Sequence, residues 1–195
     1  DYFFGFSCRD LAGNEGSYGK TDEFVIDKTE PVIHVEYDNY DVKNELYYNT
    51  PRTAKITITD KNFRSDDVDI LVNAENEGQI LVAPAVSGWI SSGDNHQATI
   101  TYDIDAAFFF DIAYTDLAGN AAEDYAGDSF IVDLTKPEIV ISEIEDRSAN
   151  NGIVSPMIMV TDTNYGIGSA WFELIGWQNG MIDAAKISDK IPNGE

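Results

Sequence analysis

Apolar and polar residues alternate with a period of two along most of the chain. In the clearest stretch, Phe108, Phe110, Ile112 and Tyr114 alternate with residues that are mostly smaller or more polar. The same alternation recurs over residues 33–35, 54–58, 68–72, 98–102 and 130–132. A period of two predicts β-strands with one buried face, and no segment shows the 3.6-residue period of an amphipathic helix. The pattern therefore predicts an all-β protein.

Residues typical of turns separate these predicted strands. The turns are predicted at residues 76–78, 92–94, 118–120 and 179–180, each of which contains a glycine next to Asn, Asp, Ala or Glu. Glycine tolerates positive φ, and Asn and Asp bond to nearby backbone amides, so these residues favour tight connections between strands. The connections are therefore expected to be short.

An internal repeat sets the organisation of the chain. The five-residue segment DLAGN at Asp10–Asn14 recurs at Asp116–Asn120, about 106 residues later, and Phe24–Pro31 matches Phe130–Pro137 at the same spacing. A second motif, Thr59-Asp60-x-Asn62-Phe63, resembles residues 161–165 at a spacing of about 102 residues. Repeats of this kind indicate one structural unit used several times. About seven short strands in about 106 residues are typical of a β-sandwich.

The repeat predicts three segments. Residues 1–29 correspond to the last strands of one repeat, residues 30–135 to a complete repeat, and residues 136–195 to the first part of another. The outer segments would each expose unpaired strand edges and apolar faces, which favour pairing with another chain. We therefore expect head-to-tail strand complementation between molecules.

These motifs resemble those of a known family. The aromatic strand followed by Asp-x-Ala-Gly-Asn, and then Phe-x-x-Asp-x-Thr-x-Pro, is similar to the bacterial immunoglobulin-like repeats of large surface proteins, and also to hyalin-type repeats. Tyr47, Tyr48, Arg52 and Trp89 extend the resemblance. It implies immunoglobulin-like β-sandwiches in tandem, in an extracellular, cell-surface or cell-wall location. The neighbouring repeats of the same chain would then be partners.

Charge restricts the choice of partner. The chain has 195 residues with 12 Lys and Arg against 35 Asp and Glu, a net charge of −23. Nucleic-acid binding requires clustered basic residues, and anionic membrane surfaces attract them as well, so both partners are unexpected. No apolar run is long enough to span a membrane. Divalent cations and basic protein partners remain compatible with this composition.

The Asp-x-Ala-Gly-Asn motif has two interpretations. As a turn, the Asp116 carboxylate accepts backbone amides while Gly119 adopts positive φ. As part of a calcium site, the motif supplies carboxylate and amide oxygens, which calcium prefers. In an immunoglobulin-like sandwich the loop after the second strand, the loop between the last two strands and the incoming linker lie at one end. This arrangement predicts a calcium site formed by Asp27, Glu30, Asp60, Asn62, Asp116 and Asn120.

Other candidate sites are weaker. Tyr47 and Tyr48 follow the acidic, Tyr-containing segment 37–41 and would suit a glycan or a host protein, or else close the edge of the sandwich. The carboxylates are too numerous for any pair to indicate glycoside hydrolysis, and no catalytic residue or other cofactor is predicted. Cys8 is expected to be buried and inert, His34 to be exposed and His96 to lie in a loop.

The sequence thus favours a non-catalytic spacer or adhesion module of a bacterial cell-surface protein that projects or presents binding domains. Two alternatives stay open: an adhesin domain that binds a host glycan or protein, and an accessory domain of a secreted carbohydrate-active enzyme. The prolines at the junctions, Pro31 and Pro137, would stiffen the links between repeats.

Overall fold

The computed structural model describes residues 1–17, 19–166, 170, 176–178 and 181–183. The chain divides into two compact units, Asp1–Val132 and Asp133–Glu195. The described part is all-β, with one short 3-10 turn at Ser65–Asp67 and no α-helix. No helix in these residues is long and apolar enough to cross a membrane. The turn predicted at residues 179–180 lies outside the described part.

The first unit contains two sheets. One has the strand order β3 (Val32–Tyr37), β5 (Arg52–Thr59), β9 (Asn95–Tyr102) and β8 (Ile90–Ser92), and every neighbouring pair is antiparallel. The other has the order β4 (Tyr47–Tyr48), β11 (Asp128–Val132), β10 (Ala106–Tyr114), β6 (Val68–Asn76) and β7 (Gln79–Ile80). Its pairs are antiparallel except β4 with β11, which are parallel.

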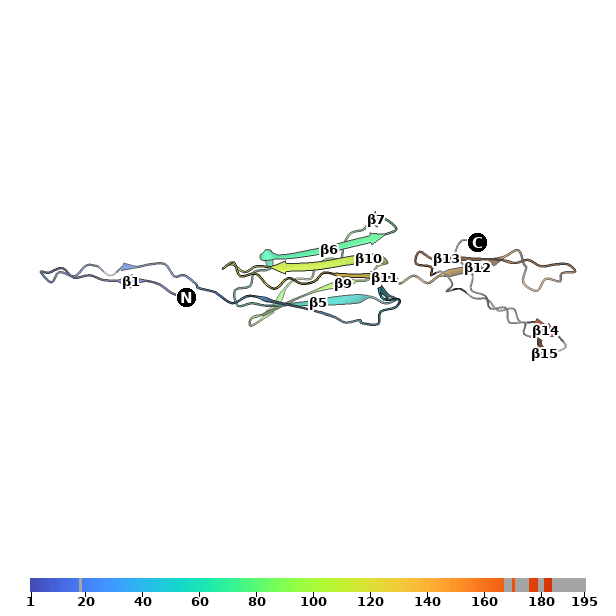
Figure 1. The fold of residues 1–195 in the computed structure, drawn as a ribbon, viewed down its shortest axis with the longest axis horizontal. Helices are drawn as coiled ribbons and strands as arrows, with labels where there is room; N and C mark the ends of the chain where they lie inside the picture. The colour runs from blue at the N-terminus through green and yellow to red at the C-terminus, as the bar shows by residue number, and fades with distance from the viewer. Residues whose placement is uncertain (18, 167–169, 171–175, 179–180, 184–195) are drawn as a thin grey trace. The chain divides into compact units, whose positions relative to one another are not determined.

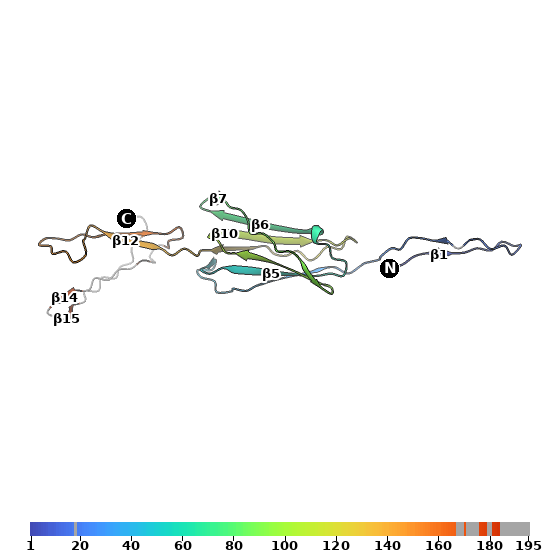
Figure 2. The ribbon, with the colours of Figure 1, turned by 180° about the vertical axis from the view of Figure 1, so that it is seen from behind.

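The two sheets face each other as layers of a β-sandwich. Figure 1 shows β6 and β10 in one layer and β5 and β9 in the other, and Figure 2 shows the same layers from behind. Aromatic rings from the two sheets meet between the layers. The ring centroid of Tyr102 on β9 lies 4.9 Å from that of Phe108 and 4.9 Å from that of Phe130. This contact places the apolar core between the sheets.

The observed core confirms the alternation read from the sequence. Buried and more exposed positions alternate along β9 and β10, and the buried positions carry apolar or aromatic side chains except for His96 on β9. The largest fully buried side chains are Tyr102, Phe110, Ile56, Ile58, Ile100 and Val132. Complete burial of an Ile, Val or Phe side chain stabilises the folded state by about 1.5–3 kcal/mol. Residues 32–132 contain nine strands rather than seven, because β4 and β7 add two short edge strands.

The segment before the sandwich is a separate hairpin. It contains β1 (Gly5–Phe6) and β2 (Gly19–Lys20), with isolated bridges from Tyr2 to Phe24 and from Arg9 to Glu15. Cys8 on this hairpin is exposed, so the prediction that it is buried is wrong. The reason is that the described part of the chain places no second sheet over the face that carries it.

The second unit contains two further hairpins. β12 (Glu138–Ser142) pairs antiparallel with β13 (Met157–Thr161), and β14 (Gly176–Gln178) pairs antiparallel with β15 (Met181–Asp183). The register of β12 and β13 pairs Glu138 with Thr161, as Val32 pairs with Thr59 in the sandwich. These partners are offset by the same 106 and 102 residues that relate the sequence motifs.

Candidate metal centre

Three acidic side chains gather at one end of the sandwich. Asp60 follows the last residue of β5, Asp116 lies just beyond β10, and Asp27 comes from the segment that precedes β3. One carboxylate oxygen from each residue lies within 4.8 Å of the others. Asp60 and Asp116 are only 6% and 5% exposed, and Asp27 is half-buried. Two opposing sheets and the incoming chain thus contribute one carboxylate each.

Asp116 is held by its own turn. Its Oδ1 accepts the backbone amides of Ala118 at 2.9 Å and Asn120 at 2.8 Å, and its Oδ2 accepts Asn120 Nδ2 at 2.8 Å. Gly119 has φ of 89°, as the turn requires. Burial alone would raise the pKa of the Asp116 carboxyl, but these bonds to its ionised form outweigh burial and lower it. Asp116 therefore stays ionised at neutral pH.

Asp60 is held by groups from both sheets. The Tyr114 hydroxyl donates to Asp60 Oδ2 at 2.9 Å, and the amide of Asn62 donates to Oδ1 at 3.2 Å. Burial raises the pKa of Tyr114 to about 12, and its bond to Asp60 and the charges of Asp60 and Asp116 add to the rise. The hydroxyl therefore remains a donor.

Asp27 connects the incoming chain to both loops. The side-chain amide of Asn62 donates to Asp27 Oδ2, and that of Asn120 reaches the Asp27 carbonyl oxygen at 3.4 Å. The amide of Thr29 donates to Asp27 Oδ1 at 3.0 Å, which closes a small turn. The segment before the sandwich is therefore anchored to its end by side-chain contacts as well as by the covalent chain.

Five of the six residues predicted for calcium lie together here. Glu30 is exposed and lies outside the group of three carboxylates. None of the ion pairs among the described residues involves Asp27, Asp60 or Asp116. Carboxylates this close repel each other unless a proton or a cation lies between them, and oxygen donors from carboxylates and amides suit calcium. The residues present therefore fit a calcium ion.

Sequence reasoning missed one buried partner of this site. His96 lies on β9 rather than in a loop and is 8% exposed, so its predicted position is wrong. Its Nε2 donates to the Asp60 carbonyl oxygen at 2.9 Å, its Nδ1 accepts from the Ser91 hydroxyl at 2.7 Å, and Phe63 stacks on its ring at 4.1 Å. The signal was in the sequence, since His96 continues the alternating buried positions Ala98, Ile100 and Tyr102.

The predicted ligand-binding tyrosines lie at the opposite end of β5. Tyr48 is buried against Phe130 and lies under the Arg52 guanidinium, whose carbon is 4.3 Å from the Tyr48 ring centroid. Tyr47 is half-buried and pairs with Ile131 on β11. The Tyr48 ring therefore serves to close the sandwich edge and offers no free face to a glycan.

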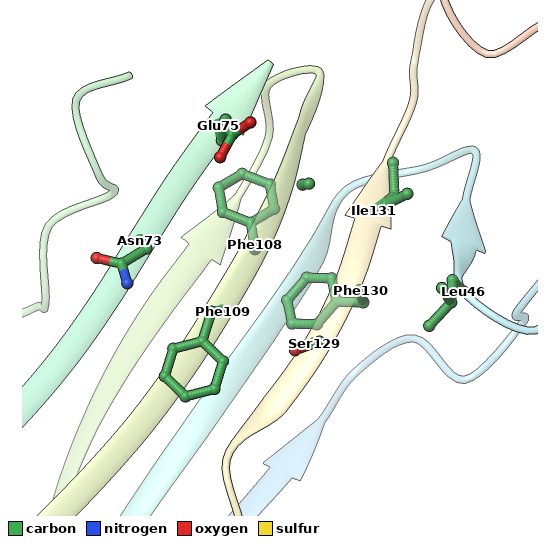
Figure 3. Close-up of a pocket in the computed structure, with 9 residues that line it drawn as sticks. Leu46, Asn73, Glu75, Phe108, Phe109, Ser129, Phe130 and Ile131 are labelled. Atoms are coloured by element: carbon green, nitrogen blue, oxygen red, sulfur yellow. The ribbon is translucent and has the colours of Figure 1, made fainter. Parts of the chain in front are cut away.

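A shallow depression lies on the outer face of the second sheet. Its volume is about 390 Å³, and Figure 3 shows Asn73, Phe109 and Ser129 side by side on β6, β10 and β11. The Phe109 ring occupies the space beside Gly127, where an added Cβ would lie 2.9 Å from it. This face presents an aromatic ring flanked by polar side chains, with Glu75 nearby.

Comparison of the chain with known protein-family models, curated proteins and solved structures finds no match.

Proposed function

We propose that the chain is a non-catalytic spacer module of a bacterial surface protein, built from immunoglobulin-like repeats joined end to end. The sheet order supports this assignment. The order β3-β5-β9-β8 corresponds to strands A, B, E and D of an immunoglobulin sandwich, and β6, β10 and β11 correspond to C, F and G. The family resemblance of the repeat motifs supports an extracellular location. Such a module would project binding domains away from the cell.

The anchoring of Asp27 is the observation that carries this proposal. A linker between independent domains is ordinarily mobile, and relative motion of the domains is the default expectation. Here the linker carboxylate is bonded to Asn62, and its backbone carbonyl to Asn120, in two loops of the sandwich. A junction fixed in this way limits bending, which is the property that a spacer needs.

A calcium ion would strengthen the same junction. It would be held by the carboxylates of Asp27, Asp60 and Asp116, and it would relieve their mutual repulsion. Because one ligand comes from the linker and two from the sandwich, binding would couple the order of the linker to the stability of the domain. Asn62 and Asn120 could add side-chain oxygens if their amides rotated.

Calorimetric unfolding of the full 195-residue chain with calcium and with chelator tests the calcium part of this proposal. A ligand at a hundredfold excess over its dissociation constant stabilises the native state by about 2.7 kcal/mol. For a domain of this size we expect the unfolding temperature to rise by on the order of 10 °C. Asp27→Asn should remove the rise, because an amide replaces one of the three carboxylates.

The matched control is Glu30→Gln, which removes a charge from the same linker outside the carboxylate group. We expect it to keep the full calcium response. Loss of the response in both variants would mean that only the overall charge of the linker matters. No response in the unaltered chain would leave a junction held by hydrogen bonds alone.

A second candidate is an adhesin domain that binds a glycan, and the depression around Phe109 favours it. Sugar rings pack on aromatic faces while neighbouring acids and amides bond to hydroxyl groups, and Phe109 has Asn73, Glu75 and Ser129 beside it. We expect Phe109→Ala to abolish binding on a glycan array, and Phe3→Ala, the aligned position in the hairpin, to leave it unchanged. An array without signal for the unaltered chain would exclude this candidate.

A further inference from the structure

The outer face of the second sheet carries an aromatic ring held in a defined place. Phe109 on β10 lies between Asn73 on β6 and Ser129 on β11, its partners in the two ladders (Figure 3). A Cβ added at Gly127 would lie 2.9 Å from two atoms of the Phe109 ring, so this glycine provides space that the ring occupies. The ring is half-buried and keeps part of its surface open to solvent. Phe109 therefore offers a positioned apolar surface on which the C–H face of a sugar ring can pack.

Small side chains beside Phe109 form the depression. Ala107 precedes Phe109 by two residues on the same face of β10, and Ser129 lies directly opposite Phe109 on β11. Both side chains are shorter than a phenyl ring, so the surface is lower beside it. The volume of about 390 Å³ falls within the range of small-molecule sites. Because the depression is shallow, it suits a chain that lies across the face rather than a ligand that is enclosed.

The polar side chains at this depression remain available to a ligand. Asn73, Glu75 and Ser129 are exposed, and none of the three forms a side-chain hydrogen bond or an ion pair with another described residue. An amide and a hydroxyl both donate and accept hydrogen bonds, whereas an ionised carboxylate only accepts. Asn73 and Ser129 can therefore serve the hydroxyl groups of a sugar, and Glu75 requires a donor.

The same face has negative charge and no positive charge. The strands β6, β7, β10 and β11 contain no lysine or arginine, whereas Asp69, Glu75 and Asp111 lie on their outer face. Asp111 follows Phe109 on one side, and Glu75 is its diagonal neighbour on the other, a position typically about 7–8 Å away. A sugar that carries a carboxylate or a sulfate would be repelled by these groups, and a cationic sugar would be attracted.

We propose that the glycan bound at this depression is an amino sugar whose amine is not acetylated, as in a polymer of glucosamine. The inference rests on the glycan-binding function proposed for the Phe109 depression. The sugar ring packs on Phe109, its hydroxyl groups bond to Asn73 and Ser129, and its ammonium group donates to the Glu75 carboxylate. Hydrogen bonds between two charged groups are roughly twice as strong as neutral ones. Glu75 thus selects the free amine over the acetylated one.

The outer face also favours an oligomer over a single sugar. Ile80 on β7 pairs with Glu75 and is 90% exposed, so the face continues as apolar surface beyond the depression. A further sugar unit of an extended chain would pack on this side chain. Contacts with two or more units add area to a site that is too shallow to enclose one unit.

Isothermal titration calorimetry on the full 195-residue chain tests the choice of sugar. The probes are two oligomers of equal length, one of glucosamine and one of N-acetylglucosamine, at a slightly acidic pH at which the free amine is protonated. We expect the glucosamine oligomer to bind roughly fivefold more tightly, the upper range for an exposed ion pair. Added sodium chloride should reduce this preference by screening. Equal affinities, or tighter binding of the acetylated oligomer, would overturn the inference.

Two variants locate the charge that selects the amine. They are needed because the net charge of −23 attracts a cationic oligomer to any part of the chain. Glu75→Gln should bring the two affinities to within about twofold of each other. The matched control is Asp69→Asn, which removes the same charge from the outer face near the opposite end of β6, outside the depression. It should keep the full preference, and an equal loss in both variants would contradict a role for Glu75.

Phe109→Ala separates this inference from the function on which it rests. We expect this variant to lose binding of both oligomers. If both oligomers bind the unaltered chain equally and Phe109→Ala abolishes both, the glycan-binding function stands and the selection of the amine is wrong. If Phe109→Ala still binds the glucosamine oligomer, general charge attraction explains the binding and the inference is wrong. If the unaltered chain binds neither oligomer and gives no signal on a glycan array, both the inference and the function are wrong.

Discussion

At the scale of single residues, Asp116 holds its own turn and also belongs to the group of three carboxylates. Its carboxylate closes the turn through bonds from Ala118 and Asn120, and it also faces Asp27 and Asp60. Sequence reasoning set turn chemistry against a metal site as alternatives. The geometry makes them compatible, because a carboxylate oxygen that accepts an amide proton still has a lone pair directed elsewhere.

The lowered pKa of Asp116 predicts how the sandwich responds to acid. A carboxyl whose pKa is lower in the folded state than in the unfolded chain adds stability above the unfolded value, which is about 4. That stability is lost as the pH falls through the folded value. We expect urea unfolding in chelator to show stability falling below pH 4, and Asp116→Asn to show a shallower fall. An equal fall in both proteins would contradict the assignment.

At the scale of strands, the alternating pattern was sufficient to predict the long strands. All six predicted strand regions fall within β3, β5, β6, β9, β10 and β11. The short strands β4, β7 and β8 were missed, because a period of two cannot be recognised over two or three residues. The prediction that Cys8 is buried was wrong for a different reason. Alternation identifies an apolar face but does not show whether another sheet covers that face.

The contacts by which Arg52 closes one end of the sandwich could not be predicted from the sequence either. Arg52 is buried, and its guanidinium carbon lies 3.5 Å from the Tyr37 ring centroid and 4.5 Å from that of Phe130. Its Nε donates to the carbonyl oxygen of Asn39 at 3.1 Å. These partners lie between residues 37 and 130 in the sequence, so no local motif predicts their contacts with Arg52. Such contacts depend on the pairing of distant strands, which only the folded chain displays.

At the scale of the whole molecule, the candidate metal centre follows from topology. Five of its six predicted residues were brought together by one assumption, that two loops and the incoming linker share an end of the sandwich. Glu30 is exposed in the same linker and lies outside the group of three carboxylates. The sequence already argued against Glu30 as a calcium ligand, because Lys136 occupies the aligned position at the next junction. At that next junction, Asp133 and Asn164 take the places of Asp27 and Asn62, and the side-chain amide of Asn164 donates to Asp133 Oδ2 at 2.9 Å.

The net charge of −23 predicts two separable responses to added ions. Raising sodium chloride from 10 to 150 mM shortens the Debye length from about 30 to 8 Å, so repulsion among exposed acids weakens. We expect this change to raise the unfolding temperature of the unaltered chain and of Asp27→Asn equally. Calcium added at constant ionic strength should raise it further in the unaltered chain alone, because only a site with fixed oxygen ligands distinguishes calcium from screening. If calcium added nothing beyond matched sodium chloride, general charge screening would account for the whole response, and the three carboxylates would stabilise the junction through their hydrogen bonds only.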